Sequence, residues 1–349
     1  MKNILITGGA GFIGSHICLT LLEADYNIYI VDNFLNGSKK VFDSIKKIIK
    51  RKANFDINRL NIFDGDIRDE DFLNGVFEEA SKNGKSIDGV IHCAGLKAVR
   101  ESIDDPLSYW DTNVCGSINL LKVMNKNQCR TILFSSSATV YGKSSQIPFK
   151  EYSSLKPINP YGETKFTVER ILENLFESLI SKWQVGYLRY FNPIGAHHSG
   201  LIGETPSYNP QNIFPLICKV AAGLKDKLYI YGNDWPTKDG TCHRDYIHII
   251  DLSVAHKKAI DYLFVNTSSK LILNVGTGKS KSVLDLINIF EKVNEVKVNY
   301  EFADRRDGDI ALSLADTNKI SKILNWRPEK TIEDMCRDGW RWQKNILNK

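Results

Sequence analysis

The first half of the chain alternates short apolar runs with longer stretches of helical periodicity. The apolar runs are nearly continuous, as is typical of strands that are buried on both faces of a parallel sheet. They lie at residues 3–7, 27–31, 88–92, 131–135 and 185–190. Because helix-like stretches separate them, the pattern predicts βαβ units and an α/β fold with a doubly wound parallel sheet.

The second half has a different pattern, in which loops rich in Gly, Pro and Asn separate the expected elements. Strands are expected at residues 228–231 and 271–275, and helices at 213–224, 282–293 and 331–344. We therefore expect a first domain over residues 1–190 and a smaller, mixed α/β domain over residues 191–349. A segment near residues 245–262 is expected to return to the first domain.

Composition and charge narrow the class of protein. The 349 residues are 42% hydrophobic and 25% charged, which is ordinary for a globular protein. The net charge of +5 suits a small anionic ligand and is weak evidence for nucleic acid. A basic run over residues 39–52 has its apolar positions at helical spacing, so it predicts a solvated amphipathic helix.

The cysteines and histidines do not suggest a metal site. The seven cysteines are scattered without a C-x-x-C pair, which favours a reducing compartment and argues against structural zinc. The adjacent His197 and His198 cannot easily converge on one ion, so we expect no metal. No apolar run has membrane-spanning length and the chain starts directly with a strand, so we expect a soluble, cytoplasmic protein with no membrane or nucleic-acid partner.

A Gly-rich segment between the first strand and the first helix predicts a dinucleotide site. None of the three glycines has a Cβ atom. Gly8 therefore permits a tight turn, Gly11 permits the approach of a pyrophosphate, and Gly14 permits the helix to pack closely on the strand. The helix N-terminus that begins with Phe12 and Ile13 supplies free N–H groups for the phosphates. Asp32 ends the next strand and suits a ribose 2′-hydroxyl. The segment thus predicts a Rossmann-like domain that prefers NAD to NADP.

The segment YGETK suggests a proton carrier. Asn159-Pro160 is typical of a helix start, so Tyr161 and Lys165 are expected on one helix face. A phenol titrates near pH ~10 and is a poor base at neutral pH. The ammonium group of Lys165 and the positive ring of NAD⁺ are expected to lower the pKa of Tyr161 toward neutrality, where a general base works best. Three serines, residues 135–137, end the strand that precedes this helix and offer a hydroxyl group that could orient the substrate.

Together these features resemble the extended short-chain dehydrogenase/reductases, and more closely the UDP-glucose 4-epimerase family. The resemblance covers essentially the whole chain. It rests on the segments DNFLNGS, GDIRD, AGLKAVRES, SSSATVYG, NPYGETK, LRYFNPIGAH, GNDWPTKDGTCHRDYIH and RRDGD.

The resemblance implies an isomerase of galactose metabolism that epimerises a UDP-hexose reversibly at C4. Tyr161 would move the proton of the 4-hydroxyl, Lys165 would assist it, and Ser137 matches the family's catalytic serine. A 4-keto sugar would turn over within the pocket between two hydride transfers, so NAD would stay bound as a resident cofactor. The residues 1–190 would then bind NAD and the residues 191–349 the nucleotide sugar. A homodimer is also implied.

The resemblance further implies two sets of binding residues. The cofactor set adds to the glycine turn and Asp32 the residues Asn33, Asn36, Gly37, Ser38, Asp66, Ile67, Cys93, Ala94, Gly95, Lys97, Asn113, Ser135, Tyr161, Lys165 and Phe191. The substrate set comprises Lys97, Ser137, Tyr161, Asn192, Asn212, Ile213, Tyr229, Ile230, Tyr231, Arg244, Arg306, Asp309 and Ser313. Arg244 and Arg306 match the family's diphosphate-binding arginines, and a guanidinium suits bidentate contacts to phosphate.

Three positions depart from the commoner family pattern. Cys93 stands where many members carry an aromatic residue, and Arg100 where many have Gly. Ser313 stands where some epimerases have Tyr, and a small residue there enlarges the sugar pocket. We therefore expect that UDP-GlcNAc and UDP-GalNAc are also accepted.

Two other functions remain open from the sequence. A nucleotide-sugar 4,6-dehydratase has the same fold but needs carboxyl groups beside the serine, where this chain has Ala138 and Thr139. A non-catalytic NAD-binding sensor would commonly lose the Ser–Tyr–Lys set, which is complete here.

Overall fold

The computed structural model describes residues 1–50, 56–143, 146–178, 182–205, 212–266, 269–306 and 308–348. The chain forms two compact units. Unit 1 comprises Met1–Val140, Pro157–Arg189 and Ser253–Leu273, and unit 2 comprises Tyr141–Lys156, Tyr190–Leu252 and Asn274–Lys349.

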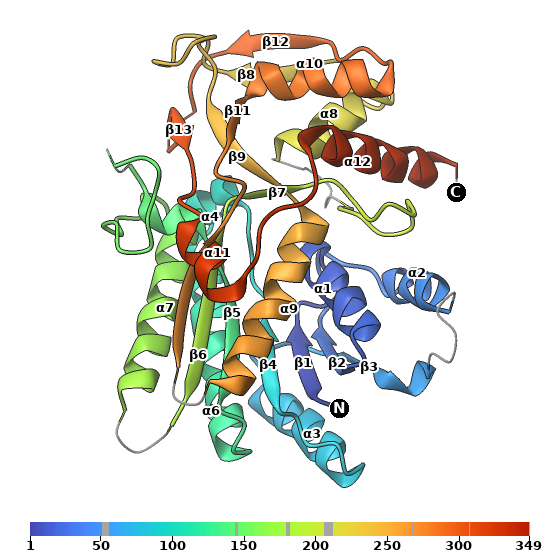
Figure 1. Cartoon of the computed structure of the whole chain (residues 1–349), viewed down its shortest axis with the longest axis vertical. Helices are drawn as coiled ribbons and strands as arrows, with labels where there is room; N and C mark the ends of the chain where they lie inside the picture. Colours follow the sequence, from blue (N-terminus) through green and yellow to red (C-terminus); the bar gives the residue numbers. More distant parts are fainter. Residues whose placement is uncertain are drawn as a thin grey trace. The chain divides into compact units, whose positions relative to one another are not determined.

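Unit 1 is built on a seven-stranded sheet with the strand order β10-β6-β5-β4-β1-β2-β3 (Figure 1). Its strands are β1 (Asn3–Thr7), β2 (Asn27–Asp32), β3 (Leu60–Asp64), β4 (Gly89–His92), β5 (Thr131–Ser137), β6 (Gln184–Tyr190) and β10 (Lys270–Val275). β1 pairs in parallel with both β2 and β4. Since the chain leaves β1 toward one side and later returns to the other, the order of winding reverses between β1 and β4. Ligands of such sheets bind at the carboxyl ends of the strands next to this point.

Helices cover both faces of this sheet. They are α1 (Phe12–Glu23), α2 (Lys40–Ile49), α3 (Glu70–Lys82), α4 (Val99–Asp104), α5 (Pro106–Tyr109), α6 (Gly116–Lys126), α7 (Pro160–Glu177) and α9 (Ile249–Val265), together with the 3₁₀ turn η1 (Ile57–Arg59) and the π-helical segment η2 (Trp110–Cys115). α3, α6 and α7 share one apolar core with the sheet residues Leu5, Val90 and Phe134. α9 lies on the opposite face (Figure 1). There it packs on Gly89 and Gly186, where a Cβ atom would come within about 3.0 Å of the Phe264 ring and the Leu263 side chain.

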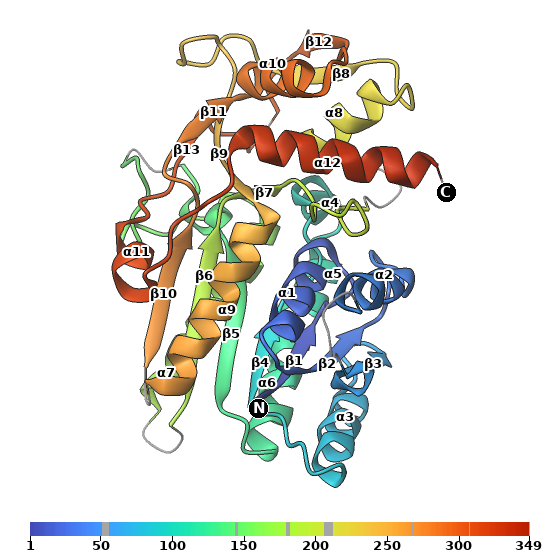
Figure 2. The same cartoon turned by 45° about the vertical axis from the view of Figure 1, so that its right-hand side comes forward.

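The described part of unit 2 contains two small sheets and four helices. Its strands are β7 (Asn192–Ile194), β8 (Leu228–Tyr231), β9 (His243–His248), β11 (Ser280–Ser282), β12 (Tyr300–Ala303) and β13 (Leu312–Ser313), and its helices are α8 (Ile213–Ala221), α10 (Val283–Asn294), α11 (Asn318–Leu324) and α12 (Ile332–Leu347). β9 is flanked by β11 and β13 and also pairs with β7, while β8 pairs with β12. α10 and α12 lie side by side (Figure 2) and each begins with a capping box. Their core includes Phe290 and Trp340, whose rings are 5.7 Å apart.

The strands and helices expected from the sequence are all present, with ends that differ by up to three residues. The parallel sheet with helices on both faces confirms the predicted fold class. One strand lies elsewhere than expected. The sequence pattern places the run at 271–275 in the smaller domain, whereas the structure has it as β10 at the edge of the large sheet. An apolar run does not reveal which sheet it joins. The basic run forms α2, and Arg51 and Lys52 at its end lie outside the described residues.

No helix in the described part of the chain is both long and apolar enough to cross a membrane.

Candidate active site

The glycine turn after β1 has the geometry that its sequence predicts. Gly8 has φ +71°, and a Cβ atom there would lie 2.6 Å from the backbone nitrogen of Ala94. A Cβ atom at Gly14 would lie 2.2 Å from the carbonyl oxygen of Gly8. Gly11 is the N-cap of α1 and no side chain caps this helix end, so its first N–H groups can meet a phosphate. A Cβ atom at Gly11 would come no closer than 3.4 Å to other protein atoms, so here the glycine leaves room for a ligand.

The end of β2 braces this turn. One oxygen of the Asp32 carboxylate accepts a hydrogen bond from Ala10 N and the other from Phe34 N, both at 2.8 Å. Burial raises the pKa of Asp32, and the two backbone N–H groups oppose that rise. Each carboxylate oxygen has a further lone pair, so Asp32 can also accept from a ribose hydroxyl.

The neighbouring strand ends carry the rest of the expected cofactor set. Asn33 Nδ2 donates to Asp66 at 2.9 Å, and hydrogen bonds from Arg68 lower the pKa of Asp66 to about 2. A Cβ atom at Gly37 would lie 2.8 Å from Ala10 Cβ, so the loop after β2 lies against the glycine turn. Other members of the set lie in the segments that follow β2, β3 and β4, namely Asn36, Ser38, Ile67, Cys93, Ala94 and Lys97.

Asn113 ties this edge of the sheet to α7. It lies in the π-helical segment η2, a geometry that is frequent at functional sites. Its Oδ1 accepts from Leu96 N at 2.7 Å, and its Nδ2 donates to Leu96 O and to Thr164 Oγ1. Gly95 is required beside it, because a Cβ atom there would lie 2.8 Å from Asn113 Oδ1. Asn113 therefore holds the loop after β4 against the helix that carries the tyrosine.

Tyr161 and Lys165 lie in the first two turns of α7. Asn159 caps the helix by accepting from Gly162 N at 2.8 Å, and Pro160 takes the first helical position. Tyr161 is 7% exposed and Lys165 5% exposed. The Lys165 ammonium lies 5.9 Å from the centroid of the Tyr161 ring and donates to the carbonyl of Ser135 at 3.0 Å. Ser137 ends β5 and its hydroxyl interacts with the Tyr161 side chain.

Burial has the largest influence on the electrostatics of this pair. In the chain itself, burial raises the pKa of Tyr161 to about 12, and the hydrogen bond with Ser137 opposes that rise. Burial likewise lowers the pKa of Lys165 to about 8. Desolvation of the phenolate is the largest cause of the rise, and a pKa lowered by Lys165 and NAD⁺ together stays a prediction. A lower phenol pKa therefore requires a further positive charge.

Buried polar groups on β4 and β5 surround Lys165. Ser135 Oγ lies 3.1 Å from Cys93 Sγ and 3.0 Å from His256 Nε2. Burial raises the pKa of the Cys93 thiol to about 11. His92 lies between Thr7 Oγ1 and Ser117 Oγ, at 2.7 and 2.8 Å, and burial together with the charge of Lys165 lowers its pKa to about 3. Both groups are therefore uncharged at neutral pH and leave Lys165 as the cation.

Unit 2 brings together the expected diphosphate-binding residues. Arg244 on β9 donates from Nη1 to the carbonyls of His243 and Ile310, and its Nη2 lies 3.4 Å from Asp309 Oδ1. Arg306 Nε donates to the other oxygen of Asp309 at 3.2 Å. Its guanidinium lies over the Tyr231 ring, 4.4 Å from the centroid. Two arginines thus converge on one carboxylate, with a planar ring beside them.

The remaining expected substrate residues of unit 2 differ in how far their side chains are exposed. Ser313 on β13 is opposite Arg244 in the register with β9 and is 7% exposed. Asn212 is the N-cap residue of α8, before Ile213, and its side chain donates to Glu204 at 3.3 Å. Tyr229 is 40% exposed, whereas Ile230 is 2% exposed and belongs to the core, which leaves only its backbone for a ligand. Asn192 begins β7, and Phe191, which belongs to the expected cofactor set, directly precedes it.

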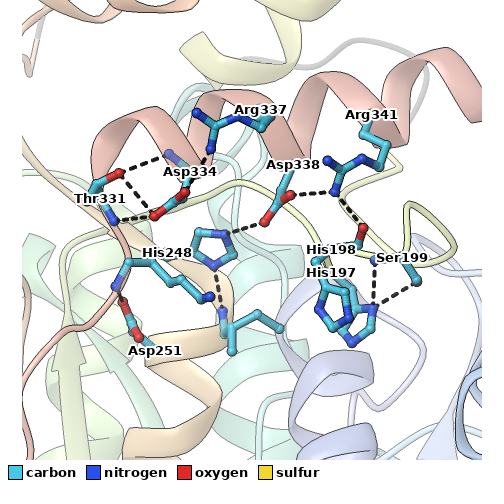
Figure 3. Close-up of polar contacts among 12 residues, drawn as sticks. His197, His198, Ser199, His248, Asp251, Thr331, Asp334, Arg337, Asp338 and Arg341 are labelled. Carbon is cyan, nitrogen blue, oxygen red and sulfur yellow. Dashed lines mark hydrogen bonds and ion pairs between the residues drawn. The ribbon is translucent and has the colours of Figure 1, made fainter. Parts of the chain in front are cut away.

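His248 and the carbonyl of His198 contact α12, whereas His197 bonds to Ser199. Figure 3 shows Asp338 between His248 and Arg341, with its oxygens 3.4 Å from His248 Nε2 and 2.8 Å from Arg341 Nη1. His197 Nδ1 is 2.8 Å from Ser199 Oγ, and Arg341 also donates to the carbonyl of His198. Over the described ranges, no three His, Cys, Asp or Glu side chains are grouped as metal ligands.

Two buried charged residues of the site were not singled out from the sequence. Glu169 follows Lys165 by one helical turn and forms an ion pair with Arg189 on β6, at 2.7 Å. The signal available in the sequence was the position of Glu169 on the buried face of α7, shared with Tyr161, Lys165 and Leu172. An acid on an apolar helix face indicates a buried partner, but it does not identify that partner.

The strand order, the glycine turn and the Ser137–Tyr161–Lys165 group define a protein of the extended short-chain dehydrogenase/reductase class. A family profile described as GDP-mannose 4,6 dehydratase matches residues 5–339. A UDP-glucose 4-epimerase of Bacillus subtilis is 44% identical over 345 residues, which cover 99% of this chain and 98% of that protein. The chain belongs to the UDP-glucose 4-epimerase family.

Two solved structures extend the comparison. A UDP-glucose 4-epimerase from Stenotrophomonas maltophila, with bound NAD and formylated UDP-arabinopyranose, has a TM-score of 0.93 at 41% identity and covers 100% of this chain and 99% of its own. A UDP-Glc/GlcNAc 4-epimerase from Campylobacter jejuni has a TM-score of 0.83 at 33% identity and covers 99% of this chain and 100% of its own.

Proposed function

We propose that the protein interconverts UDP-glucose and UDP-galactose by epimerisation at C4, with NAD as a resident cofactor. The observation that carries this proposal is the buried pair of Tyr161 and Lys165 beside Ser137, at the same sheet edge as the glycine turn. The relatives add support, because proteins named UDP-glucose 4-epimerase match the chain over nearly its whole length in sequence and in fold.

The residues of unit 1 fit NAD. The uncapped N-terminus of α1 and the space at Gly11 suit a pyrophosphate, and Asp32 suits a ribose with a free 2′-hydroxyl. A 2′-phosphate would be repelled by the Asp32 carboxylate. Bound NAD would supply the acceptor for the C4 hydride and a positive charge next to Tyr161.

The chain itself moves the proton. Tyr161 takes the proton of the sugar 4-hydroxyl as the C4–H bond breaks, and returns it when the 4-keto sugar is reduced from its other face. Ser137 donates to or accepts from the same oxygen and so orients it. Lys165 stabilises the phenolate form, which is strongly disfavoured in the protein alone because the pKa of Tyr161 is about 12. The burial of the pair excludes water from the proton transfer.

In unit 2, Arg244 and Arg306 hold the diphosphate of the UDP-sugar. Phosphate oxygens would then replace the Asp309 carboxylate as acceptors, which frees Asp309 for the ribose. Because the nucleotide would provide most of the binding free energy, the hexose can be held loosely enough to turn over.

Incubation with UDP-galactose and no added NAD tests the proposal. We expect UDP-glucose to appear until the two sugars reach equilibrium. A 4-keto-6-deoxy product would instead indicate a dehydratase, which is the class named by the family profile. The chain has no carboxyl group at Ala138 or Thr139, immediately after Ser137, for that elimination. Bound NAD without any turnover would indicate a sensor and contradict the proposal.

Ser313 is expected to admit an N-acetyl group on the sugar. The wild-type protein should then turn over UDP-GalNAc, and Ser313→Tyr should abolish this activity while UDP-galactose turnover continues. Coupled product analysis with both sugars measures the ratio. Ser81→Tyr, at an exposed position in the last turn of α3, is a control that should leave the ratio unchanged. Undetectable wild-type turnover of UDP-GalNAc beside rapid turnover of UDP-galactose would reject this role.

The assignment of residues 1–190 to NAD and 191–349 to the nucleotide sugar remains part of this proposal, as do a homodimer and a cytoplasmic location. Sedimentation equilibrium of the purified protein tests the oligomeric state, for which we expect a mass near twice that of the 39.6 kDa chain.

A further inference from the structure

Glu169 and Arg189 form a nearly inaccessible ion pair behind the Ser137–Tyr161–Lys165 group. Each side chain is 3% exposed. Arg189 Nε lies 3.0 and 3.2 Å from the two carboxylate oxygens of Glu169, and Arg189 Nη2 lies 2.7 Å from Oε2. Ser136 Oγ donates to Oε1 at 2.5 Å. The carboxylate is thus held by donors from two strands, β5 and β6.

Stability alone does not account for such a pair. Desolvation of two charges offsets much of their attraction, and well-packed apolar residues of similar volume often replace a buried ion pair without loss of stability. The location of the pair is specific. Glu169 is four residues after Lys165, hence directly behind it on the helix face, and Ser136 lies between Ser135 and Ser137 on β5.

The charges around Lys165 explain what this carboxylate does. The titratable or charged groups around Lys165 include His92, Cys93, Tyr161 and Glu169, with Arg189 paired to Glu169 and His256 of α9 bonded to the hydroxyl of Ser135. His92, Cys93 and Tyr161 are uncharged at neutral pH, because burial shifts the pKa of each group away from its charged form. Glu169 is then the one anion among these groups. Burial has the largest influence on the pKa of Lys165 and lowers it, and interactions first with Cys93 and then with Glu169 oppose that lowering. Because the Cys93 thiol is uncharged at neutral pH, Glu169 is the opposing charge there.

We propose that Glu169 is a positioning residue of the active site, whose carboxylate, fixed by Arg189 and Ser136, keeps Lys165 in its ammonium form and in place behind Tyr161. The inference rests on the proposed function, since it assigns to Lys165 the task of stabilising the phenolate of Tyr161. Arg189 acts one step further away, because it holds the carboxylate in the position that serves Lys165.

The charges of Lys165 and Glu169 determine in which direction the titration of Lys165 should shift. Lys165 is an ammonium group below its pKa and loses its charge as the pH rises through about 8. Glu169→Gln removes the anion but keeps the shape, so Lys165 should lose its proton at lower pH. A unit charge one helical turn away in a partly polar interior corresponds to a shift of about 1–2 pH units.

The experiment reads the titration of Lys165 directly. Lysine labelled with carbon-13 at Cε is incorporated into the full chain, and the Lys165 signal is assigned by its loss in Lys165→Arg. In Glu169→Gln we expect this signal to titrate about 1–2 pH units lower than in the wild type. Glu169→Asp keeps the negative charge, so in this variant Lys165 should titrate close to the wild-type pH. Glu173→Gln is the matched control, because Glu173 is one turn further along α7 and pairs with Lys270; it should leave the titration unchanged.

A second variant keeps the test valid if Glu169→Gln does not fold with Arg189 left unpaired. Glu169→Gln/Arg189→Met removes both charges and should fold. Lys165 should still titrate below the wild-type value, but by less than in Glu169→Gln, because the loss of the more remote Arg189 cation partly offsets the loss of the anion. An unchanged titration of Lys165 in either folded variant would overturn the positioning role. The pH profile of UDP-galactose turnover separates the positioning role of Glu169 from the proposed epimerase function. A shifted titration in a protein that never epimerises the sugar would uphold the role of Glu169 and contradict the proposed function.

Discussion

Tyr161→Phe is expected to lower kcat for UDP-galactose by about 10²- to 10⁴-fold, the contribution typical of a positioned general acid–base. The ring of Tyr161 is buried, so Phe fills the same space and only the hydroxyl is lost. Thermal stability should therefore change by less than about 1.5 kcal/mol, the net contribution of one hydrogen bond. Steady-state kinetics, together with a thermal melt of the same preparation, separate lost chemistry from lost fold.

A matched phenol provides the control for this substitution. Tyr152 is 80% exposed, so Tyr152→Phe should leave kcat at the wild-type value. Undiminished turnover by Tyr161→Phe would show that another group carries the proton. It would also contradict the proposal that Lys165 stabilises the phenolate of Tyr161.

Gly8→Ala is expected to have the second-largest effect, on cofactor retention and on folding. The backbone of Gly8 has φ +71°, which costs a residue with a Cβ atom about 1–2 kcal/mol. The new Cβ would also lie 2.6 Å from Ala94 N and 2.8 Å from Ala94 Cα, so the end of β4 must move. We expect a loss of at least about 2 kcal/mol in the free energy of unfolding and a fall of tenfold or more in affinity for NAD.

Gly75→Ala serves as the control for the loss of a glycine. Gly75 is exposed in the middle of α3, and a Cβ atom there would meet nothing within 4 Å. The substitution should stabilise the protein by about 0.5–1 kcal/mol, because alanine is the better helix former. Chemical denaturation and the NAD content of the purified variants measure both effects. Full NAD content in a folded Gly8→Ala variant would contradict the assignment of the turn.

The parallel sheet was predictable because strands buried on both faces give continuous apolar runs. β3 was not predicted, since it is an edge strand whose residues after Leu60 are only partly buried. β7, β11 and β13 have only two or three residues, too few to show a period. The apolar pattern of β10 predicts a strand, but the sheet that this strand joins is decided by tertiary contacts.

The local parts of the site were predictable for a similar reason. Gly8, Gly14 and the Tyr161–Lys165 spacing act within one turn or one helix, and their geometry is as expected. The pKa of Tyr161 was not predictable, because it depends on burial by distant segments. The pair Glu169–Arg189 also depends on the fold, since it joins α7 to β6, which lies between β10 and β5 in the sheet. Sequence spacing thus identifies the reacting groups, whereas their charge states are set by the packing around them.

The central claim is that one bound cofactor removes and returns the same hydride at C4 while Tyr161 exchanges the proton. The most direct measurement is an incubation with UDP-galactose deuterated at C4, without added NAD, followed by mass and NMR analysis of the sugar. We predict UDP-glucose that keeps its deuterium at C4. Loss of the deuterium to solvent, or its appearance at another carbon, would contradict the account.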